Sequence, residues 1–469
     1  MSELGALSLL PPLLAIALAI ISRQVILSLG AGIWLGFTLL AGYNPLAGAA
    51  DSLQGIIDVF GDAGDTRVLL FTLLIGSLIA TIEHSGGVRG FVHFLESRRW
   101  VHTGKRAQFL AWLTGLVIFI ESNITLLVAG AVSRPLFDRY KVSREKLAYL
   151  IDSTSAPVCS VIPLNAWGAV IIGLIASTGL EQPLGVFIAS IPYNLYAWIA
   201  IALSALVVAK NINLGPMRAA EQRTQDGQLV WPGHVDTVDS SSATATTDSG
   251  EDTPSAAFML LPILTMVIAM PASLYVTGNG SLIEGSGSTS ILWSVCAGLV
   301  TSWLMALISR RSSITELMNL FMAGAARLLP IATILLLALA LGDVTRLLGT
   351  GPYVAGIASA SVPEVLLAPL VFIVSAFIAF SVGSSWGTFA IMIPIAVPIA
   401  LTLDLPVPLF LGAAVSGAIF GDHASPISDT TVVASMAAAT DHIEHVRTQL
   451  PYALLAGAIA SIGFFVLSF

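Results

Sequence analysis

The two polar stretches Asp152-Ser-Thr-Ser-Ala-Pro157 and Asp422-His-Ala-Ser-Pro426 lie in strongly hydrophobic surroundings and decide the fold prediction. Each combines an acid, hydroxyl side chains and a proline within a segment apolar enough to cross a membrane. A carboxylate at membrane depth costs about 2.5 to 3.5 kcal/mol on insertion scales, so it usually marks an ion or substrate pathway. The prolines predict that both helices are broken at these stretches, which would free backbone carbonyls for a cation.

Composition places the rest of the chain in a membrane. Hydrophobic residues make up 56% of 469 residues and charged residues only 10%, whereas a soluble domain carries about 25% charge. The charges cluster and leave apolar stretches of about 20 residues, which match the hydrocarbon thickness of a bilayer. We therefore predict an all-α integral membrane protein without a nucleic-acid partner. Its first helix, Leu4–Ile21, is expected to be retained because no basic stretch precedes it.

The chain divides into two parts of similar length. Residues 211–256 are rich in Ser, Thr, Asp and Gly, and this composition predicts a flexible polar linker. On either side lie a first transmembrane repeat, 1–210, and a second, 257–469.

The two parts correspond to each other in sequence. Glu121-Ser-Asn-Ile-Thr125 matches Gly383-Ser-Ser-Trp-Gly-Thr388, and the acidic stretch at 152–157 matches that at 422–426. The offsets between matching stretches are similar, so we predict an internal repeat in which each half has one broken helix.

The positions of lysine and arginine predict the topology. Five basic residues in 89–106 and five in 134–146 flank the apolar stretch 107–133, so both flanks belong in the cytoplasm. Two half-helices that enter and leave on the same side fit this better than one crossing. The segment 347–446 contains no Lys or Arg, so we expect 366–400 to form a matching re-entrant hairpin from the outside.

This topology gives each half about five crossings plus one hairpin. The odd number of crossings inverts the second half, places both termini outside the cytoplasm and leaves the linker 211–256 inside it. In the alternative topology each hairpin is a single span, and the two basic groups lie on opposite faces of the membrane. We expect the two hairpin tips and the two helix breaks to line a common cavity, because non-helical backbone at membrane depth needs one.

Side chains with oxygen atoms at the tips and breaks form the candidate binding site, because sodium takes several oxygen ligands. The first-half set is Ser122, Asn123, Thr125, Asp152, Ser153, Thr154 and Ser155. The second-half set is Ser384, Ser385, Thr388, Asp422, Ser425, Ser428, Asp429 and Thr430. Sodium itself is assigned to Asn123, Asp152 and Ser155. For any single hydroxyl, the alternative is a hydrogen bond to the backbone of its own helix.

Proton coupling requires a group that titrates in the working pH range. The candidates are Asp422, His423, Asp429 and Glu121, and imidazole changes its charge near neutrality. We assign sodium binding mainly to Asp152 and proton coupling mainly to the Asp422, His423 and Asp429 group. His423 has an alternative role as a neutral histidine bonded to Asp422 or to a backbone carbonyl.

Another group of acids and histidines follows the second polar stretch. We expect Asp441-His-Ile-Glu-His445 to form a solvated helix cap rather than a metal site, because it lacks a known ligand spacing.

The motifs resemble those of the NhaC-type sodium/proton antiporter family. The resemblance rests on Gly421-Asp-His-Ala-Ser-Pro-Ile-Ser-Asp-Thr-Thr431 with Asp441–Leu450, and on Asp152–Cys159 with Ile162–Trp167. It implies the ion-transporter-superfamily architecture of inverted repeats, hairpins and broken helices. It also implies a homodimer in the bacterial inner membrane that works by an elevator-type motion. The chain departs from the family at His423, where members often carry Lys.

Two functions are compatible with these features. The first is exchange of sodium for protons, with no cofactor beyond the transported sodium ion. The alternative is sodium- or proton-coupled transport of a small organic acid or amino acid bound between the hairpin tips. No Arg lies at either tip to bind a carboxylate, which mildly favours the first function. An enzyme is not expected, because the sequence has no nucleophile–base set, phosphate loop or cofactor motif.

Overall fold

The computed structural model describes residues 5–22, 24–91, 102–119, 122–229, 255–281, 285–350, 353, 356 and 362–469. Within these ranges every regular element is a helix. Eight of the described helices are long and apolar enough to cross a membrane, and up to ten spans result if each of two bent helix pairs is one span. The prediction of an all-α membrane protein is confirmed.

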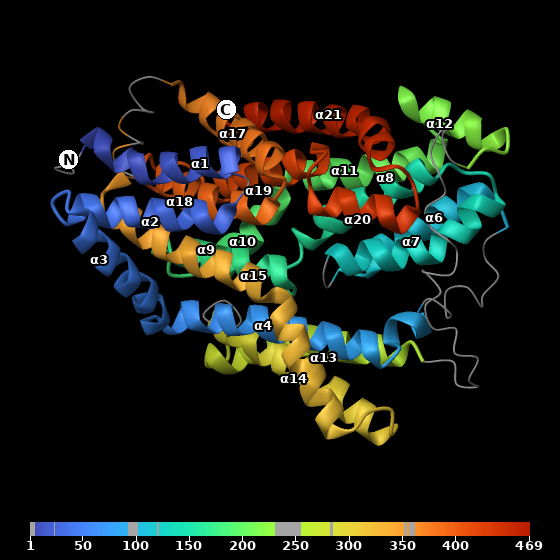
Figure 1. The fold of residues 1–469 in the computed structure, drawn as a ribbon, viewed down its shortest axis with the longest axis horizontal. Coiled ribbons are helices and arrows are strands. Elements are labelled where there is room, and N and C mark those ends of the chain that lie inside the picture. Colours follow the sequence, from blue (N-terminus) through green and yellow to red (C-terminus); the bar gives the residue numbers. More distant parts are fainter. Residues whose placement is uncertain are drawn as a thin grey trace.

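The helices of the two halves are arranged around a shared core (Figure 1). In the first half they are α1 (Leu10–Ser22), α2 (Val25–Leu40), α3 (Pro45–Asp58), α4 (Ala63–His84), α6 (Gly104–Val117), α7 (Ser122–Arg139), α8 (Arg144–Cys159), α9 (Ala166–Ala176), α10 (Pro183–Ser190) and α11 (Leu195–Lys210). After α12 (Pro216–Gln225), the second half has α13 (Ala257–Thr277), α14 (Gly287–Ile308), α15 (Ile314–Leu347), α17 (Leu367–Val382), α18 (Ser385–Thr402), α19 (Val407–Ala424), α20 (Asp429–Ala438) and α21 (His442–Leu467).

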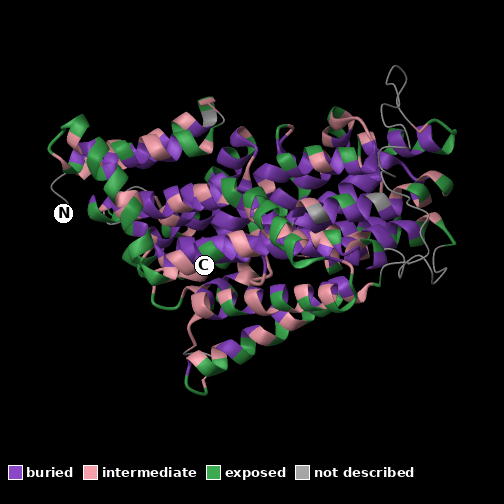
Figure 2. Cartoon of the chain, turned by 60° about the horizontal axis from the view of Figure 1, so that its bottom comes forward, coloured by how far each residue is buried: buried purple, intermediate pink, exposed green. Residues whose placement is uncertain are grey.

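Helix α15 runs from beside α9 in the central bundle down to a layer of α4, α13 and α14, which lies below the other helices in Figure 1. Within it α4 packs against both α14 and α15, and α13 packs against α14. Gly76 and Gly324 lie where α4 crosses α15, and a Cβ atom on either glycine would collide with the backbone carbonyl of the other. The two helices therefore approach as closely as their backbones allow. Figure 2 shows that buried residues gather in the central bundle.

The packing of the two halves is reciprocal. Helix α2 packs against α15 while α14 packs against α4, and α8 packs against α21 while α19 packs against α11. Likewise α6 and α7 pack against α8, and α17 and α18 pack against α19. Each of these pairings thus has a counterpart in which the halves are exchanged, as expected for an internal repeat.

Both stretches predicted as hairpins consist of two helices that pack against each other, α6 with α7 and α17 with α18. Gly383 joins α17 to α18 with a φ angle of +70°, in the left-handed region that favours glycine. A Cβ atom there would also press against the backbone of Ile427. The tip of the second hairpin therefore contacts the break between α19 and α20. That each hairpin enters and leaves on one side of the membrane stays a prediction.

The position of the first helix break was predicted wrongly. Helix α8 continues through Pro157 to Cys159, so Asp152 lies within a helix and not at a break. The interruption comes at residues 160–165, because Pro163 disfavours helical geometry at Ile162 and the Asn165 side chain caps α9 by accepting from Gly168 N. The second break lies at 425–428 and includes Pro426, close to where it was predicted.

Two described helices, α3 and α12, were not predicted. Helix α3 follows a sharp bend after α2, with 119° between the helices. Helix α12 falls inside the segment 211–256, which we expected to be irregular. Its Met217, Ala220 and Glu221 are buried, so an irregular, exposed conformation is wrong for this helix.

Candidate functional site

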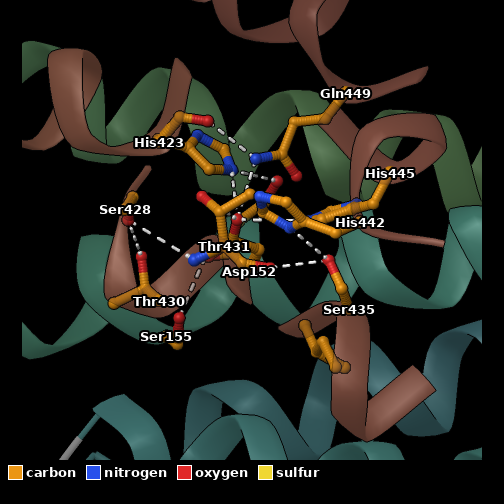
Figure 3. Close-up of polar contacts among 12 residues, drawn as sticks. Asp152, Ser155, His423, Ser428, Thr430, Thr431, Ser435, His442, His445 and Gln449 are labelled. Atoms are coloured by element: carbon orange, nitrogen blue, oxygen red, sulfur yellow. Dashed lines mark hydrogen bonds and ion pairs between the residues drawn. The ribbon is translucent and has the colours of Figure 1, made fainter. Parts of the chain in front are cut away.

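The carboxylate of Asp152 is the centre of a polar network between the two halves (Figure 3). Its side chain is 1% exposed. Gln449 Nε2 donates to Asp152 Oδ2 over 2.8 Å, and the Thr431 hydroxyl lies 3.5 Å from the same oxygen. His445 Nε2 and His423 Nε2 lie 3.5 and 3.8 Å from it. All these partners belong to α19, α20 and α21, so the second half provides the surroundings of a first-half acid.

His423 connects this network to α11. Its Nδ1 lies 2.6 Å from the hydroxyl of Tyr196, and its Nε2 lies 3.4 Å from the hydroxyl of Ser153. Gln449 Nε2 also donates to the carbonyl of His423 over 2.7 Å. The alternative considered above, a ring bonded to Asp422 or to a carbonyl, does not match these contacts. The imidazole instead lies between Tyr196 and the helix that carries Asp152.

Asp422 contacts the tip of the second hairpin. The hydroxyl of Ser385, the first residue of α18, donates to Asp422 Oδ2 over 2.6 Å. Asp422 lies in the last turn of α19 and is buried. The Ser425 hydroxyl donates to the carbonyl of Phe380 in α17 over 2.7 Å. The second hairpin is thus bound to the second break at two points, one of which is the carboxylate of Asp422.

Several other predicted hydroxyls bond within their own helices. Thr154 and Ser155 donate to the carbonyls of Leu150 and Asp152, and Thr388 donates to that of Ser384. Ser384 and Ser428 cap α18 and α20 by accepting from backbone N–H groups. For these residues the alternative of local hydrogen bonding describes the observed contacts.

The remaining predicted residues surround this centre less closely. Thr430 is paired with Ser428 over 3.0 Å, and Asp429 is exposed at the first turn of α20. Ser122 and Thr125 are buried near the start of α7, where the Thr125 hydroxyl donates to the carbonyl of Ile118. Asn123 is half-buried in the same turn. Glu121 lies outside the described residues.

The tip of the first hairpin contacts the first break. Asn165 Nδ2 donates to the carbonyls of Phe119 and Cys159 over 3.0 and 2.8 Å. This arrangement parallels that of Phe380 and Ser425 in the second half. Each hairpin therefore lies against the broken helix of its own half.

Three buried oxygen atoms of the network lack a hydrogen bond from any described residue. They are Asp152 Oδ1, Asp422 Oδ1 and Gln449 Oε1. An unsatisfied buried acceptor costs about 1 to 3 kcal/mol, and more when it is charged. These atoms are therefore suited to accept a cation, a proton or water.

Sequence analysis missed four residues of the network, Tyr196, Thr431, His445 and Gln449. The prediction that Asp441–His445 forms a solvated cap is correct for Asp441, which caps α21 by accepting from Glu444 N over 3.0 Å. It is wrong for His445, which is fully buried. The spacing of His445 and Gln449 could have indicated that both residues face the site, since residues four apart lie on one face of a helix.

Comparisons with known proteins identify the family. The profile of the Na+/H+ antiporter family matches residues 166–469. The chain belongs to the Na+/H+ antiporter family. A protein of Haemophilus influenzae described as uncharacterized is 33% identical, over 98% of this chain and 91% of its own length. The malate-2H(+)/Na(+)-lactate antiporter of Bacillus subtilis is 33% identical over 36% of this chain and 37% of its own length.

The fold is also similar to that of a solved transporter structure. MtrF of Neisseria gonorrhoeae, described as illuminating a class of antimetabolite efflux pumps, aligns with a TM-score of 0.59. The alignment covers 89% of this chain and 84% of MtrF at 17% identity, so the likeness concerns the fold. Family and fold together make this chain a secondary transporter with many membrane-spanning helices, and not an enzyme.

Proposed function

We propose that this chain exchanges sodium for protons, and that Asp152 is the carboxylate that binds the two ions in turn. The observation that carries the proposal is a buried acid whose Oδ1 atom has no hydrogen bond from a described residue, in a helix whose residues are all buried. A buried carboxylate needs a counter-charge or a proton. Sodium/proton exchange requires the same two states, one with sodium bound to the carboxylate and one with a proton bound to it.

The surroundings of Asp152 favour such competition. The unpartnered Oε1 of Gln449 and the hydroxyl of Thr431 supply further oxygen atoms beside the carboxylate. His423 and His445 are close enough for their protonation to change the field at Asp152, since Coulomb energies are large at short range in a low dielectric. Proton binding by these imidazoles would disfavour a cation at Asp152.

The geometry modifies the division of roles expected from sequence. His423 lies within 3.8 Å of Asp152, so sodium and proton groups share one network. We propose that Asp422 acts from the other end, where its bond to Ser385 connects the state of the site to the second hairpin. We keep Asn123, Ser155 and Asp429 as candidate sodium ligands. They would contribute in a state of the transporter in which the hairpin tips lie closer to Asp152.

Transport by purified protein in liposomes tests this function. A sodium gradient without organic solute should move protons and change the lumenal pH, and Asp152→Asn should abolish that change. Asp404→Asn, an exposed acid with φ of 54°, is a matched control because asparagine tolerates that conformation. Proton movement that depends strictly on an added organic acid would reject the proposal.

A coupled organic-acid transporter is the second candidate function. It is favoured by the similarity to a malate/lactate antiporter over 36% of the chain. Helices α18 and α20 begin at the second hairpin and the second break, and helix N-termini attract carboxylates. Sodium-dependent uptake of labelled malate or lactate, lost in Ser385→Ala, would support this candidate.

We also propose the inverted repeat, the cytoplasmic linker 211–256 and extracytoplasmic termini. The reciprocal packing described above and the two basic groups around 107–133 support them. A single cysteine at Ser242 should resist an impermeant thiol reagent in intact cells and react after lysis. Labelling in intact cells would contradict the orientation.

An elevator-type motion and a homodimer are further parts of the proposal. In support, α13 and α14 pack mainly against each other and against α4, and a glycine crossing brings α4 and α15 into close contact. Large apolar side chains such as Leu264, Ile268 and Val300 are exposed on α13 and α14. Cysteines placed at these positions and cross-linked in membranes test the homodimer. Recovery of monomers alone would contradict it.

A further inference from the structure

A cavity of about 1130 Å³ lies where α4 begins and α9 and α15 end. Its lining also includes α10 and the region between α13 and α14. None of the lining residues belongs to the network around Asp152. The cavity is therefore separate from the candidate ion site, and the transport function proposed above does not account for it.

The charge of this cavity is strongly acidic. Five acids line it, namely Asp58, Asp62, Asp65, Glu181 and Asp343. Arg346 is the one basic residue among the lining residues that the structure describes. It is already engaged, because it pairs with Asp343 over 2.8 Å and donates to the carbonyl of Ser177. Among the described lining residues, the cavity thus carries an excess of negative charge, and its one cationic side chain is already paired.

Asp65 is the acid that most needs a ligand. It is only 8% exposed, and the structure gives its carboxylate no hydrogen bond or ion pair with a described residue. The cap of α4 is supplied by Asp62, whose Oδ1 accepts from Asp65 N over 2.9 Å. A buried carboxylate with no partner is costly, so a counter-charge in the cavity would stabilise it.

The shape and walls of the cavity favour an organic cation over a bare metal ion. Among the described residues no three acids or histidines converge as a metal requires. The volume of about 1130 Å³ lies just above the range of small-molecule sites, which is about 300 to 1,000 Å³. Val68, Ile172 and Leu184 give it apolar walls. We propose that the cavity binds an organic cation, with a guanidinium or ammonium group on Asp65 and the hydrocarbon part against these walls.

Calorimetric titration of the purified full-length protein tests the site. Butylguanidinium is the probe, and butylurea is its neutral counterpart of similar shape. We expect butylguanidinium to bind, butylurea not to bind, and Asp65→Asn to weaken binding at least tenfold. Asp51→Asn removes an exposed acid of α3 that does not line the cavity, and it should leave the affinity unchanged.

Three results would overturn the proposal. They are equal binding of butylurea, unchanged affinity in Asp65→Asn, or sodium alone giving the same Asp65-dependent heat. If Asp65→Asn does not fold, Ala176→Phe provides the second variant, because it fills the cavity and keeps the acid. Retained tight binding in that variant would equally reject the site. Because this experiment measures binding and not transport, a negative result would leave the proposal of sodium/proton exchange unchanged. A negative transport result would likewise leave the proposed cavity site unchanged.

Discussion

Asp152 and His445 lie 3.5 Å apart, measured from the carboxylate Oδ2 to the imidazole Nε2, although one belongs to the first half of the chain and the other to its last helix. Both side chains are almost completely buried. The contact therefore joins the two halves at the candidate ion site. It also makes His445, which the sequence assigned to a solvated cap, a neighbour of the proposed ion-binding acid.

Replacing His445 by alanine should slow sodium/proton exchange at least tenfold and change its dependence on pH. The imidazole lies 3.5 Å from the Asp152 carboxylate, closer than that of His423 at 3.8 Å, so its loss removes a group whose protonation would disfavour the cation. Initial rates in proteoliposomes at several pH values measure both effects. His84→Ala is the control, because His84 pairs with Glu316 at the surface, where such pairs contribute little. A normal rate and pH profile in His445→Ala would remove this residue from the mechanism.

Gln449→Leu should weaken the apparent sodium affinity by about tenfold or more. Leucine removes the amide Oε1, a candidate oxygen ligand beside the carboxylate, and the amide Nε2, which donates to Asp152 and to the carbonyl of His423 and so holds the site in place. Rates measured against sodium concentration report the change. Gln54→Leu, at an exposed position of α3, should behave as the unmodified protein. Equal sodium dependence in the two variants would contradict the prediction.

Ser385→Ala should reduce transport by about tenfold without unfolding the protein. The lost hydrogen bond to Asp422 is one to a carboxyl group, for which about 1.5 to 3 kcal/mol is typical if the group is charged. Ser381→Ala is matched to it, since the Ser381 hydroxyl donates only to the backbone of its own helix. Asp422→Asn should alter the pH dependence of the same assay. If both serine variants transport equally, the bond between hairpin and break has no role in the cycle.

Glu221→Leu should destabilise the protein by about 3 to 5 kcal/mol, because it leaves the buried Lys146 ammonium without its anionic partner. The Ser143 hydroxyl would lose its acceptor as well. The double variant Glu221→Leu with Lys146→Leu should recover much of this loss. Thermal unfolding in detergent measures all three proteins. A double variant no more stable than the single one would show that the pair is not the cause.

The sequence predicted much of this architecture because the membrane constrains it. Hydropathy located most of the spanning helices, and polar residues in apolar surroundings located Asp152 and Asp422. What it could not predict are contacts between the halves, since no local pattern indicates that Gln449 or Thr431 faces Asp152. These contacts depend on how α8 packs against α20 and α21.

Two errors have local physical explanations. Pro157 has no N–H to donate to the carbonyl of Ser153, yet α8 continues two residues beyond it to Cys159, so the break lies toward Pro163. His445 was assigned to solvent because acids and histidines surround it in sequence. The first turn of α21 is indeed polar, yet the next turn already enters the protein interior.

The division of contacts around α8 has a consequence for how the protein is made. Glu145 and Lys146 pair with Arg223 and Glu221 of α12, which leaves the ribosome before any of the second half. Asp152, two turns further along the same helix, has its nearest partners between His423 and Gln449. Since chains emerge from the N-terminus, the buried charges of the first half can form their ion pairs early. Asp152 acquires its partners from α21 only when that final helix has been synthesised. Completion of the ion site is then the last step of biogenesis, because a chain that stops before α21 inserts Asp152 without Gln449 and His445.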